Sequence, residues 1–197
     1  MMETAVSFRY TLPMATLIKT QLTAHDLYNM PDHGGRNELV KGEILPMSPA
    51  STKHGQITFR LAFKVGLFAN EHSLGEVYAA ETGFTLSKNP DTVRAPDVAF
   101  IAHDRIPAKG IPDTGFWEIA PDLIAEIVSP NDRMSDVQDK ITDYLNAGVH
   151  LIWLVDPKTR TVTVYQSRQQ VEILIEGDQL TGKDVLPGFQ LALTELF

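Results

Sequence analysis

The stretch LIAEIVSPNDRMSDVQDKITDYLNAGVHLIWLV, residues 123–155, has the pattern of a strand, a helix and a second strand. Its first segment, 123–128, is predicted to be a strand, and its last segment, 151–155, is a continuous apolar run, which is typical of an inner strand covered on both faces of a sheet. The middle segment has helical apolar spacing, with Ser135 as the expected N-cap and Gly148 just past the helix end. At 33 residues the stretch has the length of a βαβ unit, which predicts two parallel strands joined by a right-handed crossover.

Shorter elements flank this unit on both sides. Upstream, the sequence predicts a helix at 24–30 capped by Thr23, a hairpin over 37–45, a helix over 54–70 capped by Ser51 or Thr52, strands at 76–80, 83–86 and 97–101, and a loop over 102–121. Downstream, residues 161–166, 171–175 and 180–185 are predicted to be antiparallel additions. This order predicts an α/β fold with a mixed sheet flanked by helices and an N-terminal hairpin extension.

The length and composition indicate one domain. The 197 residues fit a single domain over 21–197, preceded by an N-terminal arm of residues 1–20. No uncharged apolar run reaches the roughly 18 residues that a membrane span needs, so no membrane contact is expected. The N-terminus does not have the pattern of a signal peptide, and the lack of cysteine is compatible with a reducing cytoplasm, which is the expected location. Without thiolates, any metal must have oxygen or His ligands, which favours hard ions such as Mg²⁺ or Mn²⁺.

The formal net charge of −8 argues against broad, non-specific binding of nucleic acid, which usually relies on a basic surface. A site rich in carboxylates would contribute to this charge, and a local basic patch can still bind phosphates. Lys53, Arg60 and Lys64 fall within about 40° of one another on the predicted helix and form one such stripe. An ordinary solvated helix face explains the same spacing more simply.

Glu126 is the most informative single residue. Alternation places Ile124, Glu126 and Val128 on the same face of their strand. A carboxylate on an inner strand is costly to bury unless it meets a cation, accepts several hydrogen bonds or stays protonated. Glu126 is therefore a candidate metal ligand, and an ion pair with a nearby Lys or Arg is the alternative.

Asp97 is the expected partner of Glu126. Pro-Asp occurs five times in the chain and carries little information by itself, but only Asp97 and Asp122 open apolar strands. Asp122 precedes Glu126 by four residues on the same strand, about 13 Å away, which is too far to share an ion with ligands at about 2.1 Å. Asp97 is on another predicted strand and can lie beside Glu126. The alternative is a strand-start aspartate that accepts hydrogen bonds from local amides.

Lys140 is the third candidate. It stands at the edge of the apolar stripe of the predicted helix, about 40° from Tyr144. From there its ammonium could reach over the sheet towards Glu126. The alternative is a lysine that lays its stem along apolar surface and keeps its charge in water.

These residues, in this order, resemble the Uma-type putative restriction endonuclease family, a bacterial branch of the PD-(D/E)XK nuclease superfamily. The similarity covers about residues 20–195, and the ordered set is specific although no single motif is. It is carried by Glu38-Leu39-Val40-Lys41-Gly42-Glu43-Ile44, His54, Asp97, Glu126 with Ser129-Pro130, Lys140, Tyr144, Gly148-Val149 and Trp153-Leu154-Val155-Asp156-Pro157. The resemblance implies a restriction-endonuclease-like fold and a Mg²⁺- or Mn²⁺-dependent endonuclease that hydrolyses phosphodiester bonds of DNA.

The resemblance also implies a role for each residue at the centre of the site. Asp97 and Glu126, with the carbonyl of Ile127, would bind the metal, which would acidify a water and stabilise charge on the scissile phosphate. Lys140 would orient that water or neutralise the oxyanion.

Two further residues, Glu38 and His54, have implied roles around this centre. Glu38 would hydrogen-bond a ligand or complete a second metal shell, and His54 would touch a phosphate or act as an acid. The residues alone also fit an exposed strand charge and a helix-start histidine with no chemical role.

One departure from the superfamily pattern leaves the activity open. The usual motif places a lysine two residues after the acidic residue, where this chain has Val128. The resembled family takes that lysine from the following helix, and Lys140 fits. A second interpretation is therefore a catalytically inactive nuclease fold that serves as a binding or assembly module. A third is hydrolysis of another phosphodiester, such as RNA, at the same site.

The expected partner is DNA. The sequence also allows a homodimer with a second copy of the chain. Phe116-Trp117 in the predicted loop is a candidate contact for such a partner. A plug in the hydrophobic core explains these aromatic residues equally well.

Overall fold

The strand, helix and strand expected from residues 123–155 are present in the computed structural model of the protein, which describes residues 21–31 and 36–197. Strands β7 (Leu123–Ile127) and β8 (Leu151–Asp156) pair in parallel, and helix α3 (Met134–Ala147) connects them. Gly148 takes the left-handed conformation, φ 91°, that ends α3, as predicted. The arm expected at residues 1–20 lies outside the described residues.

The βαβ unit forms the middle of a six-stranded mixed sheet. In spatial order the strands are β10 (Val171–Leu174), β9 (Thr161–Tyr165), β8, β7, β6 (Val98–Ala102) and β3 (Gly75–Ala79). All pairs except β7 with β8 are antiparallel, which confirms the predicted mixed sheet and the antiparallel additions at 161–166 and 171–175.

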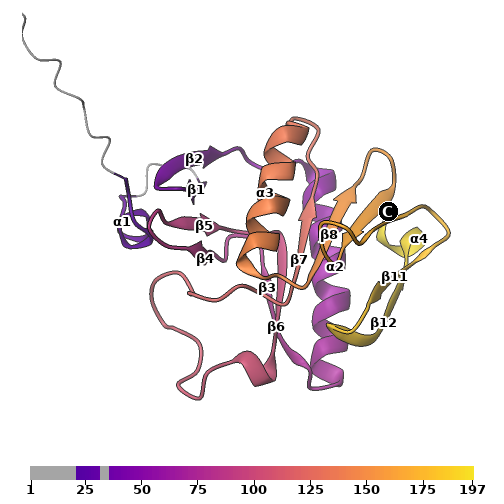
Figure 1. Ribbon diagram of the computed structural model, residues 1–197. Helices are drawn as coiled ribbons and strands as arrows, with labels where there is room; N and C mark the ends of the chain where they lie inside the picture. The colour runs from indigo at the N-terminus through magenta and orange to yellow at the C-terminus, as the bar shows by residue number, and fades with distance from the viewer. Residues whose placement is uncertain (1–20, 32–35) are drawn as a thin grey trace, which may run out of the picture.

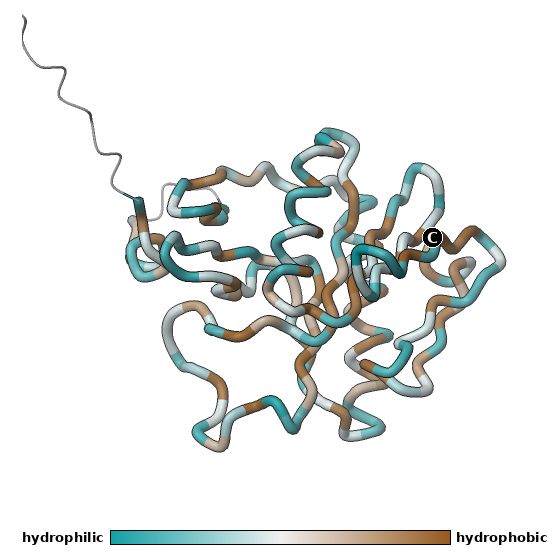
Figure 2. Tube along the Cα trace, viewed as in Figure 1, coloured by the Kyte–Doolittle hydropathy of each residue, from teal (hydrophilic) through white to brown (hydrophobic). Residues whose placement is uncertain are grey.

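Helices cover both faces of this sheet (Figure 1). On one face, α2 (Thr52–Glu71) buries Ile57, Leu61 and Val65 against the sheet, together with the C-terminal elements. On the other face, α3 buries Val137, Ile141 and Tyr144. Figure 2 shows hydrophobic stretches along the central strands between these layers. The alternation predicted for β7 is confirmed, because Leu123, Ala125 and Ile127 belong to the first core and Ile124 to the second.

A second, four-stranded sheet lies beside α3 (Figure 1). Its strands, in spatial order, are β2 (Glu43–Met47), β1 (Arg36–Val40), β5 (Thr92–Arg94) and β4 (Phe84–Ser87). The predicted hairpin is β1 with β2, which turn at Lys41 and Gly42. Helix α1 (Ala24–Tyr28) precedes it and is capped by Thr23, as predicted. This sheet carries Glu38 and Arg94 towards α3.

One local prediction was wrong, one was right only in part, and one strand was not predicted. Helix α3 begins at Met134, and Arg133 occupies its N-cap position without a side-chain hydrogen bond to the helix. Ser135 therefore lies inside the first turn and is not the N-cap. Strand β5 was not predicted, because three residues are too few to show an alternation. The segment predicted at 180–185 forms the antiparallel strand β11 (Gln179–Gly182), but among the described residues it pairs with β12 (Leu186–Ala192) and does not join the main sheet.

The prediction for the C-terminal part of the chain was also incomplete. Strand β12 (Leu186–Ala192) contains Pro187 and Gly188, which argue against a strand in a sequence pattern. The short helix α4 (Leu193–Leu196) follows it, and a 3₁₀ turn η1 (His103–Arg105) lies within the predicted loop 102–121. Within the described residues, none of the helices has the length and apolar character to cross a membrane.

Candidate active site

The pairing register of two strands brings the predicted carboxylates together. In the antiparallel pair β6–β7, Val98 lies opposite Ala125, so Asp97 is placed opposite Glu126. One oxygen of Asp97, Oδ2, accepts a hydrogen bond of 2.8 Å from the backbone N–H of Ile127. This hydrogen bond fixes the carboxylate of Asp97 at the end of β7. The two carboxylates lie on adjacent strands, as the sequence predicted.

Glu126 is buried on the face of β7 that packs against α3. The hydroxyl of Tyr144 donates a hydrogen bond of 2.6 Å to its Oε1, and the Lys140 ammonium lies 3.6 Å from its Oε2. Burial raises the pKa of Glu126 to about 7, and the negative charges of Asp97 and Glu38 contribute to the increase, whereas Lys140 and Tyr144 oppose it. Glu126 is therefore surrounded by charged side chains, and a cation bound nearby would lower its pKa.

Lys140 projects from α3 between two carboxylates. Its Nζ lies 3.2 Å from Oε1 of Glu38 and 3.6 Å from Oε2 of Glu126, and its side chain is 14% exposed. Burial works against the charged form, but the two carboxylates outweigh it and raise the pKa of Lys140. The lysine is therefore an ammonium at neutral pH, and its charge is inside the cluster and not in bulk water.

Glu38 is held by a buried guanidinium. Arg94 donates from Nη1 to Oε2 of Glu38 at 2.7 Å, and from Nε and Nη2 to Oδ2 of Asp143 at 3.0 and 2.7 Å. The backbone N–H of Ala95 donates to the other oxygen of Glu38 at 3.1 Å. With both oxygens bonded in this way, Glu38 is a fixed acceptor for Lys140. The alternative of an exposed strand charge does not describe it, because Glu38 is only 2% exposed.

His54 lies in the first turn of α2 and faces Asp97. Its Nε2 is 3.0 Å from Oδ2 of Asp97, and its Nδ1 is 3.3 Å from the hydroxyl of Thr58. The hydrogen bond with Asp97 raises the pKa of His54, against the effect of burial. The ring is buried, so this histidine orients a carboxylate and does not reach out to solvent.

The donor set fits a hard divalent ion. Across the described residues, three or more His, Asp or Glu side chains nowhere form a cage that would hold a metal alone. Mg²⁺ does not need such a cage, because it is usually bound by one or two carboxylates while waters and substrate phosphates complete its shell. Oδ1 of Asp97 accepts no hydrogen bond from any described residue, and Oε2 of Glu126 has only the 3.6 Å contact with Lys140. Asp97 and Glu126 each therefore keep an oxygen that can bind a cation.

Three members of the cluster were not identified as site residues from the sequence. Arg94 and Asp143 gave no signal, because their pairing joins β5 to α3 across 49 residues and neither belongs to a recognisable motif. Tyr144 was interpreted as part of the apolar stripe of α3, and it does pack there. Its position one turn after Lys140 on the same face was the available signal that its hydroxyl points to Glu126.

The predicted basic stripe on α2 contacts the C-terminus of the chain. Lys53 donates to the carbonyl of Phe197 at 2.9 Å, Arg60 donates to that of Leu196 at 3.3 Å, and Lys64 pairs with Glu195 at 2.7 Å. The three cations are therefore not free to bind a phosphate backbone, and they do not form a purely solvated face either.

The aromatic pair in the loop 102–121 contributes to packing. Trp117 packs at the edge of the α3 core, and Phe116 packs beside α1, where its ring meets that of Tyr28 edge-on. The interpretation as a core plug describes both residues.

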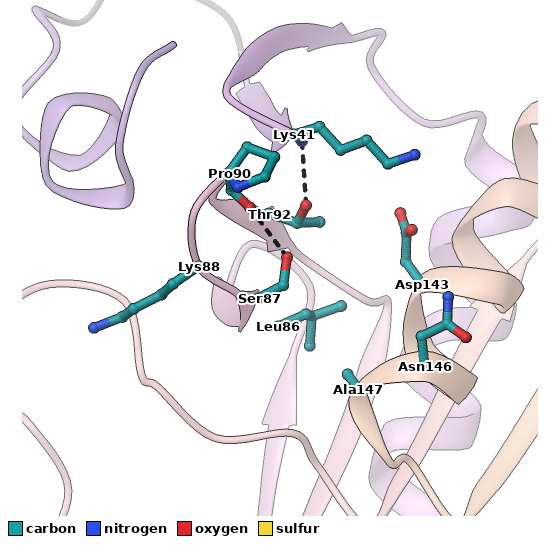
Figure 3. Close-up of a pocket in the computed structure, with 9 residues that line it drawn as sticks. All are labelled: Lys41, Leu86, Ser87, Lys88, Pro90, Thr92, Asp143, Asn146 and Ala147. Carbon is teal, nitrogen blue, oxygen red and sulfur yellow. Dashed lines mark hydrogen bonds between the residues drawn. The ribbon is translucent and has the colours of Figure 1, made fainter.

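A surface pocket of about 340 Å³ lies between the four-stranded sheet and α3 (Figure 3). Figure 3 shows Lys41 extending from the β1–β2 turn towards α3, with Ser87 and Thr92 beside it on the sheet and Asp143, Asn146 and Ala147 on the helix opposite. Asp97, Glu126 and Lys140 do not line this pocket. It meets the candidate site only through Asp143, whose carboxylate is bonded to Arg94, so the carboxylate cluster and not the pocket is the candidate for chemistry.

Comparisons with known proteins identify the family and the fold. The model of the Uma2 family, described as "Putative restriction endonuclease", matches residues 24–194. A solved structure, a putative nuclease belonging to DUF820 from Anabaena variabilis ATCC 29413, is similar with a TM-score of 0.78 and 24% sequence identity, over 89% of this chain and 97% of that chain. No curated protein matches. The fold is thus restriction-endonuclease-like, and because the matched region spans most of the chain, the protein belongs to the Uma2 family of nuclease-like proteins.

Proposed function

We propose that this protein is a metal-dependent endonuclease that hydrolyses phosphodiester bonds of DNA. The observation that carries the proposal is the buried cluster in which Asp97 and Glu126 lie opposite each other on adjacent strands and the Lys140 ammonium from α3 lies 3.6 Å from Glu126. Two carboxylates with a lysine are the groups that a phosphodiester hydrolase needs to hold a hard cation and to stabilise charge on phosphate. Membership of the Uma2 family supports the same reaction class.

In this proposal Asp97 and Glu126, with the carbonyl of Ile127, hold Mg²⁺ or Mn²⁺. The ion supplies charge neutralisation at the scissile phosphate and lowers the pKa of a water. The N–H of Ile127 and the ring of His54 fix Asp97 in place, and Tyr144 does the same for Glu126. These contacts set the positions of the metal ligands before any substrate binds.

Lys140 is the residue that we assign to the phosphate. Its ammonium lies beside Glu126 and can donate a hydrogen bond to a phosphate oxygen or to the attacking water. Glu38, held by Arg94 and the N–H of Ala95, keeps the lysine at that point. We therefore assign Glu38 a positioning role through Lys140, in place of a direct contact with a ligand.

The charge distribution predicts how such an enzyme would bind DNA. The net charge is −8, and the three cations of the α2 stripe are bonded to the C-terminal residues. That helix therefore offers no broad basic surface to DNA. Few phosphates would be neutralised on binding, so few counterions would be released from the DNA. We expect weak binding that depends on the metal and a shallow dependence of affinity on salt.

The test is metal-dependent nicking of supercoiled plasmid and cleavage of linear duplex by the wild type, Asp97→Asn and Lys140→Ala. Both variants should lose at least about a hundredfold in rate. Lys158→Ala, an exposed lysine in the β8–β9 turn, is the matched control and should cut like the wild type. Circular dichroism and urea unfolding must show that each variant is folded.

Each outcome separates one alternative. A folded, metal-loaded wild type that cuts neither DNA nor RNA would refute the nuclease, and would favour the inactive binding module that Val128 at the usual lysine position suggests. Cleavage of RNA but not of DNA would keep the site and change the substrate. Equal cleavage by Lys140→Ala would show that the lysine assignment is wrong.

A further inference from the structure

The outer face of α2 exposes large apolar side chains. Phe59, Phe63 and Leu67 recur every four residues and are 70%, 55% and 45% exposed, and the two phenylalanine rings stack with centroids 6.1 Å apart. They lie opposite the stripe that packs on the sheet. Exposed apolar residues are ordinary when scattered, but three in a row on one helix face form a patch.

No charge interrupts this face. The twenty residues of α2 include Lys53, Arg60, Lys64 and Glu71, and at 100° per residue all four fall about 100–140° from Phe59, on one side. The three cations among them are bonded to the C-terminal residues of the same chain. The sector from Phe59 to Leu67 therefore contains no charged residue of α2. Charges border it on one side, where Arg60 lies about 20° from Leu67 and the Lys53 ammonium is 3.3 Å from Oε1 of Gln56.

Two glycines border the aromatic residues on the side away from the charges. Gly55 and Gly66 lie within about 40° of Phe59, and each is expected to cost the helix about 1 kcal/mol relative to alanine. Packing inside the chain does not require them, because an added Cβ would meet nothing within 4 Å at Gly55 and only Val77, at 4.0 Å, at Gly66. Close approach of another backbone explains glycine at such positions.

We propose that this face of α2 packs against the same face of a second copy of the chain. Two-fold pairing places a patch against itself, so a charged patch would repel its copy, whereas this uncharged sector is self-complementary. The exposed parts of the three large side chains amount to about 300 Å², more than a third of the roughly 800 Å² per partner in a standard interface. They would form the apolar centre, with the glycines allowing the two helices to approach closely.

The oligomeric state of the full chain tests this proposal. Sedimentation equilibrium and light scattering should show a dimer for the wild type and an association at least about thirtyfold weaker for Phe63→Glu. Ile173→Glu is the matched control, because Ile173 on the edge strand β10 is 66% exposed and undergoes the same chemical change. It should remain dimeric. A wild type that is monomeric at its highest soluble concentration overturns the proposal, and so does a dimer that Ile173→Glu dissociates and Phe63→Glu does not.

Substitution and cross-linking locate the contact independently. Gly66→Leu improves the helix propensity but fills the space between the helices, so it should weaken association, and unchanged association would refute close approach at this point. The chain has no cysteine, so a single introduced thiol reports only its own surroundings. Among Gln56→Cys, Phe63→Cys and Asn70→Cys, at least one should form a covalent dimer on mild oxidation, whereas Ile173→Cys should not. The reverse pattern would place the interface on β10.

Discussion

The raised pKa of Glu126 predicts how the stability of the metal-free protein depends on pH. The carboxyl has an ordinary pKa of 4.5 in the unfolded chain and about 7 in the folded one, because it is buried among Asp97 and Glu38. Between these values the folded state holds a proton that the unfolded state releases. The stabilisation is therefore complete below pH 4.5 and is lost as the pH rises through 7. At about 1.4 kcal/mol per pKa unit, the loss amounts to about 3 kcal/mol.

The variant Glu126→Gln isolates this effect, since glutamine resembles the protonated acid and does not titrate. Urea unfolding in the presence of a chelator, from about pH 5 to about pH 8, should give similar stabilities at the acidic end. At the alkaline end the variant should be more stable than the wild type by about 3 kcal/mol. Glu71→Gln, at the exposed end of α2, controls for the exchange itself. A stability difference between wild type and Glu126→Gln that stays constant across this range would refute the reasoning.

Three further predictions concern the same cluster. Arg94→Met leaves the carboxylates of Glu38 and Asp143 without their cation and should cost about 3–5 kcal/mol in urea unfolding, whereas Arg133→Met, a cation with no acidic partner among the described residues, should cost little. Mg²⁺ or Mn²⁺ should raise the melting temperature of the wild type by mass action and leave that of Glu126→Gln unchanged; an equal rise in both would place the ion elsewhere. Val128→Lys in the Lys140→Ala background returns a lysine to the face of β7 that carries Glu126 and should recover part of the lost cleavage, which a rate equal to that of Lys140→Ala would contradict.

The sequence predicted the elements whose patterns are long or repeated. The two largely apolar strands of the βαβ unit and the buried stripe of α2 determined where the main strands and helices lie. A strand buried on both faces leaves an apolar run, and a helix buried on one face leaves a periodic stripe. Alternation also placed Glu126 on the face of β7 that meets α3, and that face decides which helix supplies its partners. The side-chain roles at Asp97, Glu126 and Lys140 remain predictions that activity measurements must test.

The residues that the sequence could not predict interact across long separations. Arg94 stands in a strand of three residues and acts only through Glu38 and Asp143, which lie 56 and 49 residues away. No local pattern records such a pairing, since each partner alone is compatible with an exposed charge. The direction of His54 was undetermined for the same reason. Its ring could have faced solvent or the sheet, and only the position of α2 beside Asp97 settles it.

For Glu126 the sequence left two alternatives open, an ion pair with a lysine and a role as a metal ligand. The structure contains the ion pair, but the pair does not neutralise the site, because Lys140 is shared between Glu126 and Glu38 and lies closer to Glu38. Arg94 is likewise divided between Glu38 and Asp143. Asp97 adds a further negative charge opposite Glu126, and the pKa of Glu126 stays near 7 despite the ammonium beside it. A buried cluster with more carboxylates than cations must take up protons or bind a positive ion, so the ion pair and the metal site are not competing interpretations.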